Sequence, residues 1–305
     1  MNTPSAIPLG NPSRRAALAE RPRRSALFMP ASNPRAMAKA RSIPADVIIF
    51  DLEDAVAPEM KDEAREAALQ AVYHGGFGDR EVAIRVNAID TDWGKADIEA
   101  VRRAGVDAVL APKVSGPQDV LRYHEALTGA PSDLQLWTMI ETAGSVLRLD
   151  AMGALAASTR LSLWMMGTND LAKDMRARPA PDRAVFSPML ALAVAAARAH
   201  GLAILDGVCN EFRDMRVLRA EAEQGRMFGF DGKSLIHPDQ VEPCNAVFSP
   251  SVDELEWAAQ VIAAFDQPDN AGKGAIKVLG KMVELLHLEE ARRITAVAQR
   301  IARAI

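Results

Sequence analysis

Several features that mark special classes of protein are scarce or missing in this sequence. The chain of 305 residues has two cysteines, Cys209 and Cys244, too few for a disulfide scaffold, so a reducing compartment is expected. Its longest apolar run, residues 189–197, stops well short of the ~18 residues of a membrane-spanning helix, so no membrane partner is expected. Basic residues do not outnumber acidic ones (36 against 40), which argues against a nucleic-acid partner.

Common catalytic motifs are also missing. No glycine-rich dinucleotide fingerprint follows the first predicted strand, and there is no Gly-x-Ser-x-Gly elbow or Walker loop. No HExxH, CxxC or paired-histidine spacing indicates zinc. The whole chain is 49% hydrophobic and 25% charged, which is typical of a globular protein.

The first 23 residues differ from the rest of the chain. They contain four prolines and four arginines but one acid, Glu20, and no apolar segment of a secretory signal. We expect a poorly ordered tail over residues 1–23, with a targeting peptide of mitochondrial type or a polyanion-binding arm as the alternatives. With the low cysteine content, this predicts a cytoplasmic location.

From residue 25 onward, short apolar runs alternate with longer segments of helical period. The runs are continuously apolar, as in residues 47–50 and 162–166, which is typical of parallel strands buried on both faces. Eight strands separated by helices favour a (β/α)₈ TIM barrel over an open doubly wound sheet. The predicted strands are Ala26–Met29, Asp46–Asp51, Val82–Val86, Asp107–Ala111, Leu136–Ile140, Leu161–Met166, Leu202–Asp206 and Phe228–Ile236.

Two helix starts are visible in the sequence. Ser187, followed by proline, is predicted to cap a helix over Met189–His200. Ser251 and Glu254 fit a capping box for a helix that runs through Phe265. Further helices are expected at Lys61–Val72 and Leu286–Ala304.

About sixty residues follow the eighth strand, which is more than a minimal barrel needs. They hold the capped helix, a glycine-rich break at residues 271–280 and the terminal helix. We therefore expect a barrel over residues 24–240 and a C-terminal helical extension over residues 241–305. The extension is expected to pack on the barrel or on a neighbouring subunit.

Active sites of such barrels lie at the carboxyl ends of the strands, where this sequence places many polar residues. Glu141 and Asp170 follow the neighbouring fifth and sixth strands, so their side chains are expected to meet over the barrel mouth. One or two carboxylates with water and substrate oxygens are the usual ligands of Mg²⁺, so we predict Mg²⁺ here, with Mn²⁺ as the alternative. The other polar residues at predicted strand ends include Asp51, Glu53, Asp54, Arg85, Asn87, Lys113, Asp206 and Lys233.

Arg85, at the end of the third strand, is the predicted anion clamp, because a guanidinium can hold a carboxylate with two hydrogen bonds. An ion pair of Arg85 with Glu53 or Asp54 is the alternative, and the two are compatible. Backbone N–H groups of Gly167-Thr168-Asn169 are expected to approach a bound carboxylate, with a plain turn as the alternative. His237 lies near the mouth and is interpreted as a loop or helix-start histidine.

Seven segments carry a resemblance to a known family. They are RSALFMP (24–30), DLEDAV (51–56), RVN (85–87), PKV (112–114), IET (140–142), GTNDL (167–171) and FDGKSLIHPDQ (230–240). In this order they resemble the citrate lyase β-subunit-like enzymes of the HpcH/HpaI aldolase and malyl-CoA lyase superfamily. Together they are highly specific, and the resemblance extends from residue 24 to about residue 300.

The resemblance implies a (β/α)₈ barrel that forms a homotrimer or homohexamer, uses Mg²⁺ and acts on a CoA thioester. It implies the same two metal ligands, and it implies that Arg85 binds the substrate carboxylate or oxyanion. Arg24 is expected near the CoA or substrate pocket, while Glu53 and Asp54 would orient water and Arg85.

Two positions depart from the family pattern. Pro30-Ala31-Ser32 stands where Pro-Gly-Ser is usual, which adds a methyl group where CoA is expected to pass. The segment Gly-Lys-Met-Val-Glu (280–284) ends in Glu284, where relatives often carry an aspartate that reaches a neighbouring subunit's site. The longer side chain bears on any hydrolysis or acid–base step assigned to this position.

The predicted activity is reversible carbon–carbon cleavage of a 3-hydroxyacyl-CoA thioester such as malyl-CoA, citramalyl-CoA or citryl-CoA, by retro-Claisen or aldol chemistry. The candidate bases are Glu53, Asp54 and a partner subunit's Glu284, and Arg85 with the metal would stabilise the enolate. One alternative is a metal-dependent aldolase that acts on free 2-oxo or hydroxy diacids without CoA. The other is a non-catalytic subunit that binds an acyl carrier protein.

Overall fold

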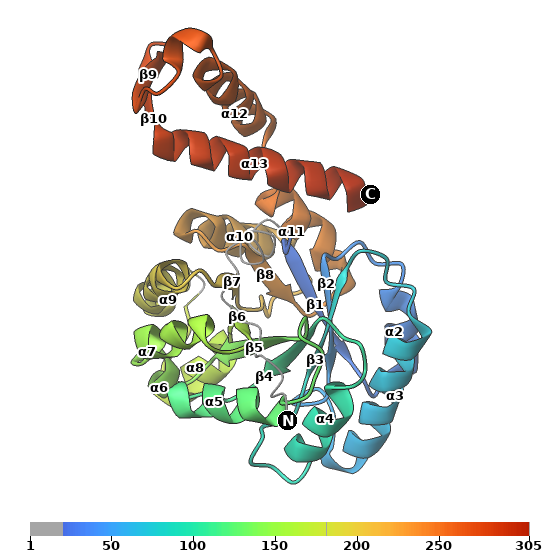
Figure 1. Ribbon diagram of the computed structural model, residues 1–305. Helices are drawn as coiled ribbons and strands as arrows, with labels where there is room; N and C mark the ends of the chain where they lie inside the picture. Colours follow the sequence, from blue (N-terminus) through green and yellow to red (C-terminus); the bar gives the residue numbers. More distant parts are fainter. Residues whose placement is uncertain (1–20, 181, 305) are drawn as a thin grey trace, which may run out of the picture. The chain divides into compact units, whose positions relative to one another are not determined.

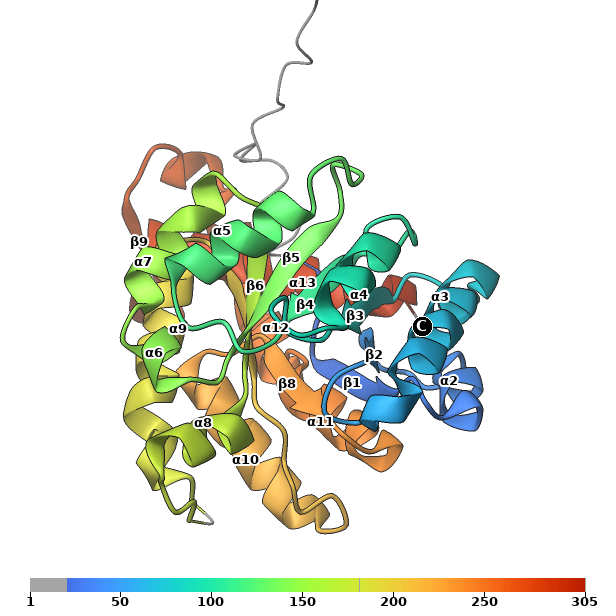
Figure 2. The same cartoon turned by 90° about the horizontal axis from the view of Figure 1, so that it is seen from below.

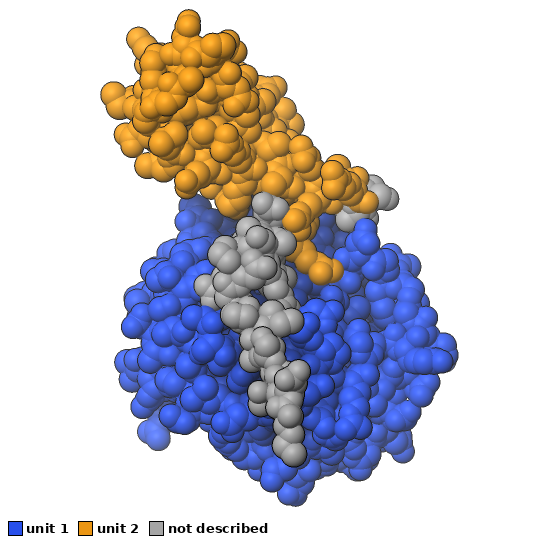
Figure 3. All heavy atoms as spheres, in the orientation of Figure 1, with its two compact units in different colours: residues 1–15, 23–248 blue, residues 16–22, 249–305 orange. Residues whose placement is uncertain are grey.

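The computed structural model describes residues 21–180 and 182–304 of the chain. The predicted tail at 1–23 therefore lies almost wholly outside the described residues. Two compact units are distinguished by colour in Figure 3. Within the described residues, 23–248 belong to the first unit, and 21–22 with 249–304 belong to the second.

The first unit is a closed barrel of eight parallel strands, which confirms the predicted TIM barrel. Each strand pairs with the next, and β1 closes the ring against β8. All eight strands lie where the apolar runs predict them, with ends that differ by up to four residues. The strands are β1 (Ser25–Pro30), β2 (Val47–Asp51), β3 (Glu81–Arg85), β4 (Ala108–Ala111), β5 (Gln135–Ile140), β6 (Leu161–Met166), β7 (Ala203–Asp206) and β8 (Gly232–Leu235).

Helices surround the strands, as Figures 1 and 2 show from two directions. The α-helices are α2 (Pro34–Ala40), α3 (Lys61–His74), α4 (Gly94–Val101), α5 (Pro117–Ala126), α6 (Ala143–Val146), α7 (Leu149–Ala154), α8 (Thr168–Met175), α9 (Ser187–Ala199), α10 (Met215–Phe228) and α11 (Val241–Phe248). Short 3₁₀ helices are η1 (Pro58–Met60), η2 (Leu155–Ala157), η3 (Ala184–Phe186) and η4 (Pro238–Gln240).

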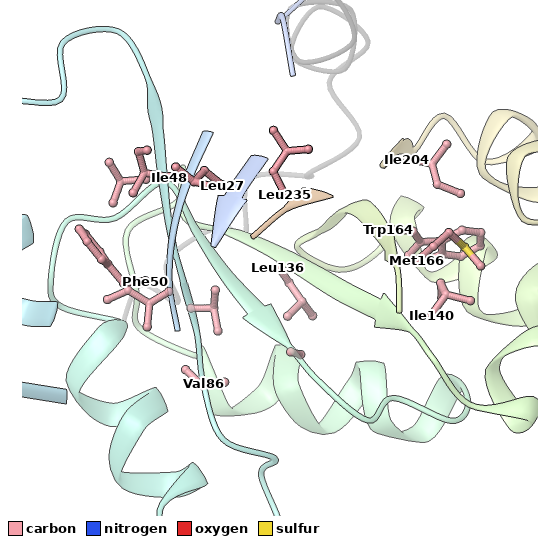
Figure 4. Close-up of a cluster of buried hydrophobic side chains, with 14 of the residues drawn as sticks. Leu27, Ile48, Phe50, Val86, Leu136, Ile140, Trp164, Met166, Ile204 and Leu235 are labelled. Atoms are coloured by element: carbon pink, nitrogen blue, oxygen red, sulfur yellow. The ribbon is translucent and has the colours of Figure 1, made fainter. Parts of the chain in front are cut away.

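Both faces of the strands are buried, which explains why the strand segments carry no polar alternation. In β2, Ile48 and Phe50 belong to the outer layer between strands and helices, part of which Figure 4 shows. Val47 and Ile49 belong to a separate cluster inside the barrel, where Trp137 is the largest side chain. This period of two in side-chain direction is the ordinary consequence of strand geometry.

A buried ion pair closes the amino-terminal end of the barrel. Arg23 donates to both carboxylate oxygens of Glu81 at 2.5 and 2.8 Å, and its guanidinium lies 5.6 Å from the centre of the Trp137 ring. Both charged side chains are almost fully buried. A charge in this position is stable only while its partner is present.

The second unit packs two helices against a β-hairpin. Its elements are α12 (Val252–Phe265), η5 (Pro268–Asn270), β9 (Ala275–Val278), β10 (Lys281–Glu284) and α13 (Leu285–Ala304). Ile276 and Val283 are directly paired across the hairpin and are buried against residues of both helices. The glycine-rich break expected at 271–280 thus contains a strand, which sequence analysis missed because each strand has only four residues.

Two further boundaries differ from the prediction. The first unit runs through Phe248 rather than residue 240, because Val241 and Cys244 of α11 are buried in the outer core of the barrel. Ser187 is the first residue of α9 and forms no side-chain cap, because the 3₁₀ turn of η3 leads directly into the helix. The capping box of Ser251 is confirmed.

The described part of the chain contains no helix that is long and apolar enough to cross a membrane.

Candidate active site

The candidate site lies at the carboxyl ends of β2 to β6, where the parallel strands bring their final residues to one rim. Asp51 and Arg85 are direct partners at the ends of β2 and β3. The other members are Glu53 and Asp54 after β2, Lys113 after β4, Glu141 after β5 and Asp170 in the first turn of α8. The predicted convergence of acids and cations on this rim is therefore present in the structure.

Arg85 is held by the protein's own carboxylates. Its Nε and Nη2 atoms donate to the two oxygens of Asp51 at 2.7 and 2.6 Å, and Nη1 lies 2.9 Å from Glu53. The guanidinium also lies 4.8 Å from the centre of the Phe28 ring. Burial lowers the pKa of Arg85, but Asp51 more than offsets this and leaves it above the usual value. The two-bond clamp predicted for substrate is therefore filled by Asp51, and the Nη1 side faces the rim acids.

Lys113 is the cation around which the acids gather. Its Nζ atom lies 2.8 Å from Asp170, 3.6 Å from Glu53 and 3.7 Å from both Asp54 and Glu141. Burial lowers the pKa of Lys113, and the surrounding carboxylates, Glu141 foremost, raise it above its usual value. The sequence places Lys113 at a strand end, at the centre of the PKV segment, but no local pattern indicates its role there.

Glu141 is fully buried, and only one of its two carboxylate oxygens accepts a hydrogen bond. Its Oε1 atom accepts a 2.6 Å hydrogen bond from the backbone N–H of Lys113, whereas Oε2 has no hydrogen-bond partner. Burial raises the pKa of Glu141, and Lys113 opposes that rise. The carboxylate fits here because residue 167 is glycine: a Cβ at Gly167 would lie 2.6 Å from Oε2.

Glu53 and Asp54 share the loop after β2 but differ in burial. Glu53 is buried, and burial raises its pKa to about 7 although Arg85 opposes the rise. Its Oε2 atom contacts Arg85 without hydrogen-bond geometry. Asp54 is exposed and lies 3.7 Å from Lys113 and 3.8 Å from Arg85.

Residues that sequence analysis left without a role hold this loop in place. Lys61 donates to the backbone oxygens of Leu52 and Glu53 at 2.8 and 2.7 Å. Asn87 donates to the same Leu52 oxygen at 3.0 Å, and Asp51 accepts from the backbone N–H of Glu53. Lys61 is the first residue of α3, and only the fold shows that its buried side chain reaches back to the loop after β2.

The predicted metal ligands satisfy the requirements of a hard cation. Glu141 and Asp170 offer carboxylate oxygens within 4 Å of one point, the Nζ atom of Lys113, and Glu141 Oε2 is an unpaired buried acceptor. No group of three or more His, Cys, Asp and Glu side chains among residues 21–180 and 182–304 is arranged to hold a metal ion. Two carboxylates completed by water and substrate oxygens are the usual Mg²⁺ arrangement, so the residues fit.

The backbone cradle predicted at Gly167-Thr168-Asn169 is only partly free. The N–H of Gly167 donates to the Ile140 oxygen, so it is used by the sheet and does not face a ligand. The Asn169 side chain forms two hydrogen bonds with Asn210, and Thr168 is buried. An approach of backbone N–H groups to a bound carboxylate therefore stays a prediction for Thr168 and Asn169 alone.

Arg24 does not lie at this rim. It precedes β1, at the opposite end of the barrel, and forms hydrogen bonds at 2.7 to 2.9 Å with Asp46 just before β2. Arg24 is therefore absent from the carboxyl-end rim of its own barrel, and its expected place near a CoA or substrate pocket stays a prediction. The reason is strand direction: the residue before a strand and the residue after it are separated by the strand's whole length.

Two other rim candidates pair with each other instead. Asp206 and Lys233 are fully buried, 3.1 Å apart, and Arg183 donates to Asp206 at 2.9 Å. His237 caps η4 and stacks on Phe212 at 5.3 Å, which confirms its interpretation as a helix-start histidine.

Glu284 ends β10 in the second unit, and its side chain is exposed. A role for it in a neighbouring subunit's site stays a prediction.

The comparisons with known proteins identify the family of this chain. A model of the HpcH/HpaI aldolase/citrate lyase family matches residues 24–238, which is more than half of the chain. The chain belongs to this family. The match includes every rim residue described above, whereas Glu284 of the second unit lies beyond it in the sequence.

Relatives within the HpcH/HpaI aldolase/citrate lyase family include enzymes with different names. A (3S)-malyl-CoA thioesterase of Cereibacter sphaeroides (strain KD131 / KCTC 12085) is 50% identical over 281 residues, covering 92% of this chain and 96% of its own. Citrate lyase subunit beta of Escherichia coli (strain K12) is 33% identical over 286 residues, covering 92% and 94%. The structure of CitE from Mycobacterium tuberculosis with magnesium, acetoacetate and coenzyme A is 28% identical, with a TM-score of 0.73, covering 92% of this chain and 99% of that one.

Proposed function

We propose that this protein is a thioesterase that hydrolyses a short dicarboxylic acyl-CoA of the (3S)-malyl-CoA class to the free acid and CoA. The observation that carries the proposal is 50% identity over nearly the whole chain to a (3S)-malyl-CoA thioesterase. The rim supports it, because two carboxylates that fit a metal ion, a guanidinium and a buried acid lie together, as the hydrolysis of an acyl-CoA with one free carboxylate requires.

Glu141 and Asp170 would hold Mg²⁺ at this rim. When bound, the ion polarises oxygen atoms of an anionic substrate and stabilises negative charge that develops on them. This proposal agrees with magnesium in the CitE structure, and the fit rests on the unpaired buried oxygen of Glu141.

The protein's own residues supply charge and a proton acceptor. Arg85 presents its Nη1 side to the rim, and its remaining donors are fixed on Asp51, so the guanidinium is oriented before substrate arrives. Glu53 is the acid that we assign to proton transfer from water, because burial brings its pKa to about 7, near neutral pH. Hydrolysis adds water across the C–S bond: the hydroxyl goes to the acyl carbon and the proton reaches the CoA sulfur.

A carbon–carbon lyase is the second candidate. It is favoured by 33% identity to citrate lyase subunit beta, and it would use the same rim residues to stabilise an enolate after cleavage. Thioester hydrolysis and carbon–carbon cleavage differ in which bond breaks, so products separate them.

A product assay with (3S)-malyl-CoA and Mg²⁺ tests the proposal. Hydrolysis predicts malate and free CoA in equal amounts, followed by thiol titration and chromatography, without glyoxylate. Glyoxylate with acetyl-CoA would establish the lyase instead. Turnover of free 4-hydroxy-2-oxo acids without any CoA ester would establish the aldolase, and no turnover without an added acyl carrier protein would indicate the non-catalytic subunit.

We also propose that the chain assembles into a homotrimer or homohexamer in which Glu284 reaches a neighbouring subunit's rim. Mixing Glu284→Ala chains with Glu141→Ala chains tests this: shared sites predict partial recovery of turnover, whereas independent sites predict none. Light scattering gives the subunit number.

A further inference from the structure

Lys113 occupies the centre of the carboxylate cluster in two ways. Its ammonium group lies within 4 Å of carboxylates from three separate loops, after β2, after β5 and at the start of α8. Its backbone N–H donates to Glu141 at 2.6 Å. The residue adopts a left-handed backbone conformation, with φ of 54°, which non-glycine residues rarely adopt. Backbone and side chain are therefore both directed at the acids.

The cluster carries more negative than positive side chains. Its acids are Asp51, Glu53, Asp54, Glu141 and Asp170, and the cations within reach of them are Lys61, Arg85 and Lys113. With all groups ionised, two negative charges are left over while Lys113 is in place and three once it leaves, so the cluster attracts a divalent cation in either case. An ammonium group neutralises only one acid, so a divalent ion is the better partner for this set.

We propose that Lys113 and the divalent metal ion are alternative occupants of this carboxylate cluster. Without metal, the ammonium group of Lys113 bridges Glu141 and Asp170 and keeps the acids together. When the metal binds those two acids, Lys113 leaves them and turns toward solvent. This inference rests on the metal site of the proposed function, but not on which substrate bond is broken.

The geometry allows this exchange. The Lys113 side chain is 34% exposed, so it has a path out of the cluster, and its shortest contact is to the partly exposed Asp170 rather than to buried Glu141. Glu141 Oε2 is unpaired while the lysine is present, so a metal ion gains a ligand that the ammonium does not use. A divalent ion bound to these acids would repel the ammonium group beside them, because like charges at such separations repel each other.

Direct Mn²⁺ binding to the metal-free protein, measured by electron paramagnetic resonance, provides the first test. Lys113→Met removes the competing cation and is expected to bind Mn²⁺ about tenfold more tightly than wild type. Lys113→Arg keeps the charge and is expected to bind within about threefold of wild type. The matched control is Lys173→Met, which removes an exposed lysine from the same helix as Asp170 and is expected to leave the affinity unchanged.

Reductive methylation of wild-type protein provides a test that requires no variant to fold. Mass spectrometry is expected to show Lys113 labelled several-fold faster with Mg²⁺ than with EDTA, while Lys173 is labelled at the same rate in both.

Each contrary result identifies the claim that fails. Equal or weaker Mn²⁺ binding by Lys113→Met would overturn the exchange, and so would methylation of Lys113 that Mg²⁺ does not accelerate. In either case, weaker Mn²⁺ binding by Asp170→Asn would still support the metal site. Mn²⁺ binding that Asp170→Asn does not weaken would overturn both. The product assay with (3S)-malyl-CoA judges the proposed reaction separately.

Discussion

At the scale of single residues, Arg85 uses part of its guanidinium to bind Asp51 and leaves the other part facing the candidate site. Asp51 takes the Nε and Nη2 donors, so an incoming anion meets Arg85 only from the Nη1 side, where Glu53 already lies. A substrate carboxylate that approached this side would bring a negative charge close to Glu53. That repulsion raises the pKa of Glu53 further, so a bound substrate is expected to make Glu53 a stronger proton acceptor.

The buried position of Glu53 predicts how stability depends on pH. Its pKa is raised from 4.5 to about 7, chiefly by burial, so the folded protein binds this proton more tightly than the unfolded chain. The resulting stabilisation is complete below about pH 4.5 and is lost as the pH rises through 7. Between these limits, metal-free wild type should lose on the order of 2 kcal/mol relative to Glu53→Gln.

Urea unfolding of both proteins in EDTA at pH 4.5, 6 and 8 measures this difference. Glu59→Gln, which changes an exposed acid nearby, is the control and should track wild type. A wild-type curve parallel to that of Glu53→Gln would show that burial does not raise this pKa.

Gly167 predicts a sharp steric effect at the site. An added Cβ would lie 2.5 Å from Cβ and 2.6 Å from Oε2 of Glu141, closer than real Cβ atoms approach such neighbours. Gly167→Ala should therefore displace the Glu141 carboxylate and weaken Mn²⁺ binding at least tenfold. Gly274→Ala, at a position with open space, is the matched control. Unchanged Mn²⁺ affinity in Gly167→Ala would contradict the assignment of Glu141 as a ligand.

At the scale of elements, the hairpin of the second unit carries a local strain. Leu279 and Gly280 form the two-residue connection between β9 and β10, and both have positive φ, at 48° and 80°. Such hairpin connections favour asparagine followed by glycine, whereas leucine is disfavoured. Leu279 is also exposed, so its side chain contributes little to the core of its unit.

Leu279→Asn should therefore stabilise the second unit by about 0.5–1 kcal/mol. Hydrogen exchange of the amides of β9 and β10 measures the effect within the unit. Leu279→Ala is the control, because it removes the same exposed surface without the residue type that tolerates positive φ. Faster exchange in the asparagine variant than in wild type would contradict the prediction.

The barrel as a whole has ion pairs at its amino-terminal end and the acids that fit a metal ion at its carboxyl-terminal rim. The amino-terminal end holds Arg23 on Glu81 and Arg24 on Asp46, while the carboxyl-terminal rim gathers the acids around Lys113. Polar groups at the amino-terminal face of such barrels contribute to stability, and those at the carboxyl-terminal face to activity. Substitutions at the two ends should therefore have separable effects.

Glu81→Gln tests the structural end. Removal of one partner from a buried ion pair leaves an uncompensated charge, which typically costs about 3–5 kcal/mol. The midpoint of thermal unfolding should fall by several degrees, while Mn²⁺ affinity of the folded protein stays unchanged. Glu290→Gln breaks an exposed pair with Arg293 and should cost less than about 1 kcal/mol. Equal effects of the two substitutions would contradict the structural role of Glu81.

The sequence predicted the rim acids and the ion pair of Arg85 with Glu53 or Asp54, which the structure confirms, but not the other partners of these residues. Glu53, Glu141 and Asp170 follow strands that are recognisable from local apolar runs, so their place at one rim follows from strand direction alone. The two hydrogen bonds between Arg85 and Asp51 depend on the register between β2 and β3. The position of Lys113 among acids from three loops depends on a left-handed backbone that no local pattern indicates.

The sequence by itself determined the eight-stranded barrel, because strands buried on both faces need continuous apolar segments and helices between them. It also determined which acids stand at the carboxyl ends of those strands. Only the tertiary structure decided that Asp51 binds Arg85 through two hydrogen bonds and that Lys113 lies among the acids, since these contacts depend on strand register and loop conformation. A few neighbouring residues determine where a strand forms, whereas this charge cluster combines residues more than a hundred positions apart.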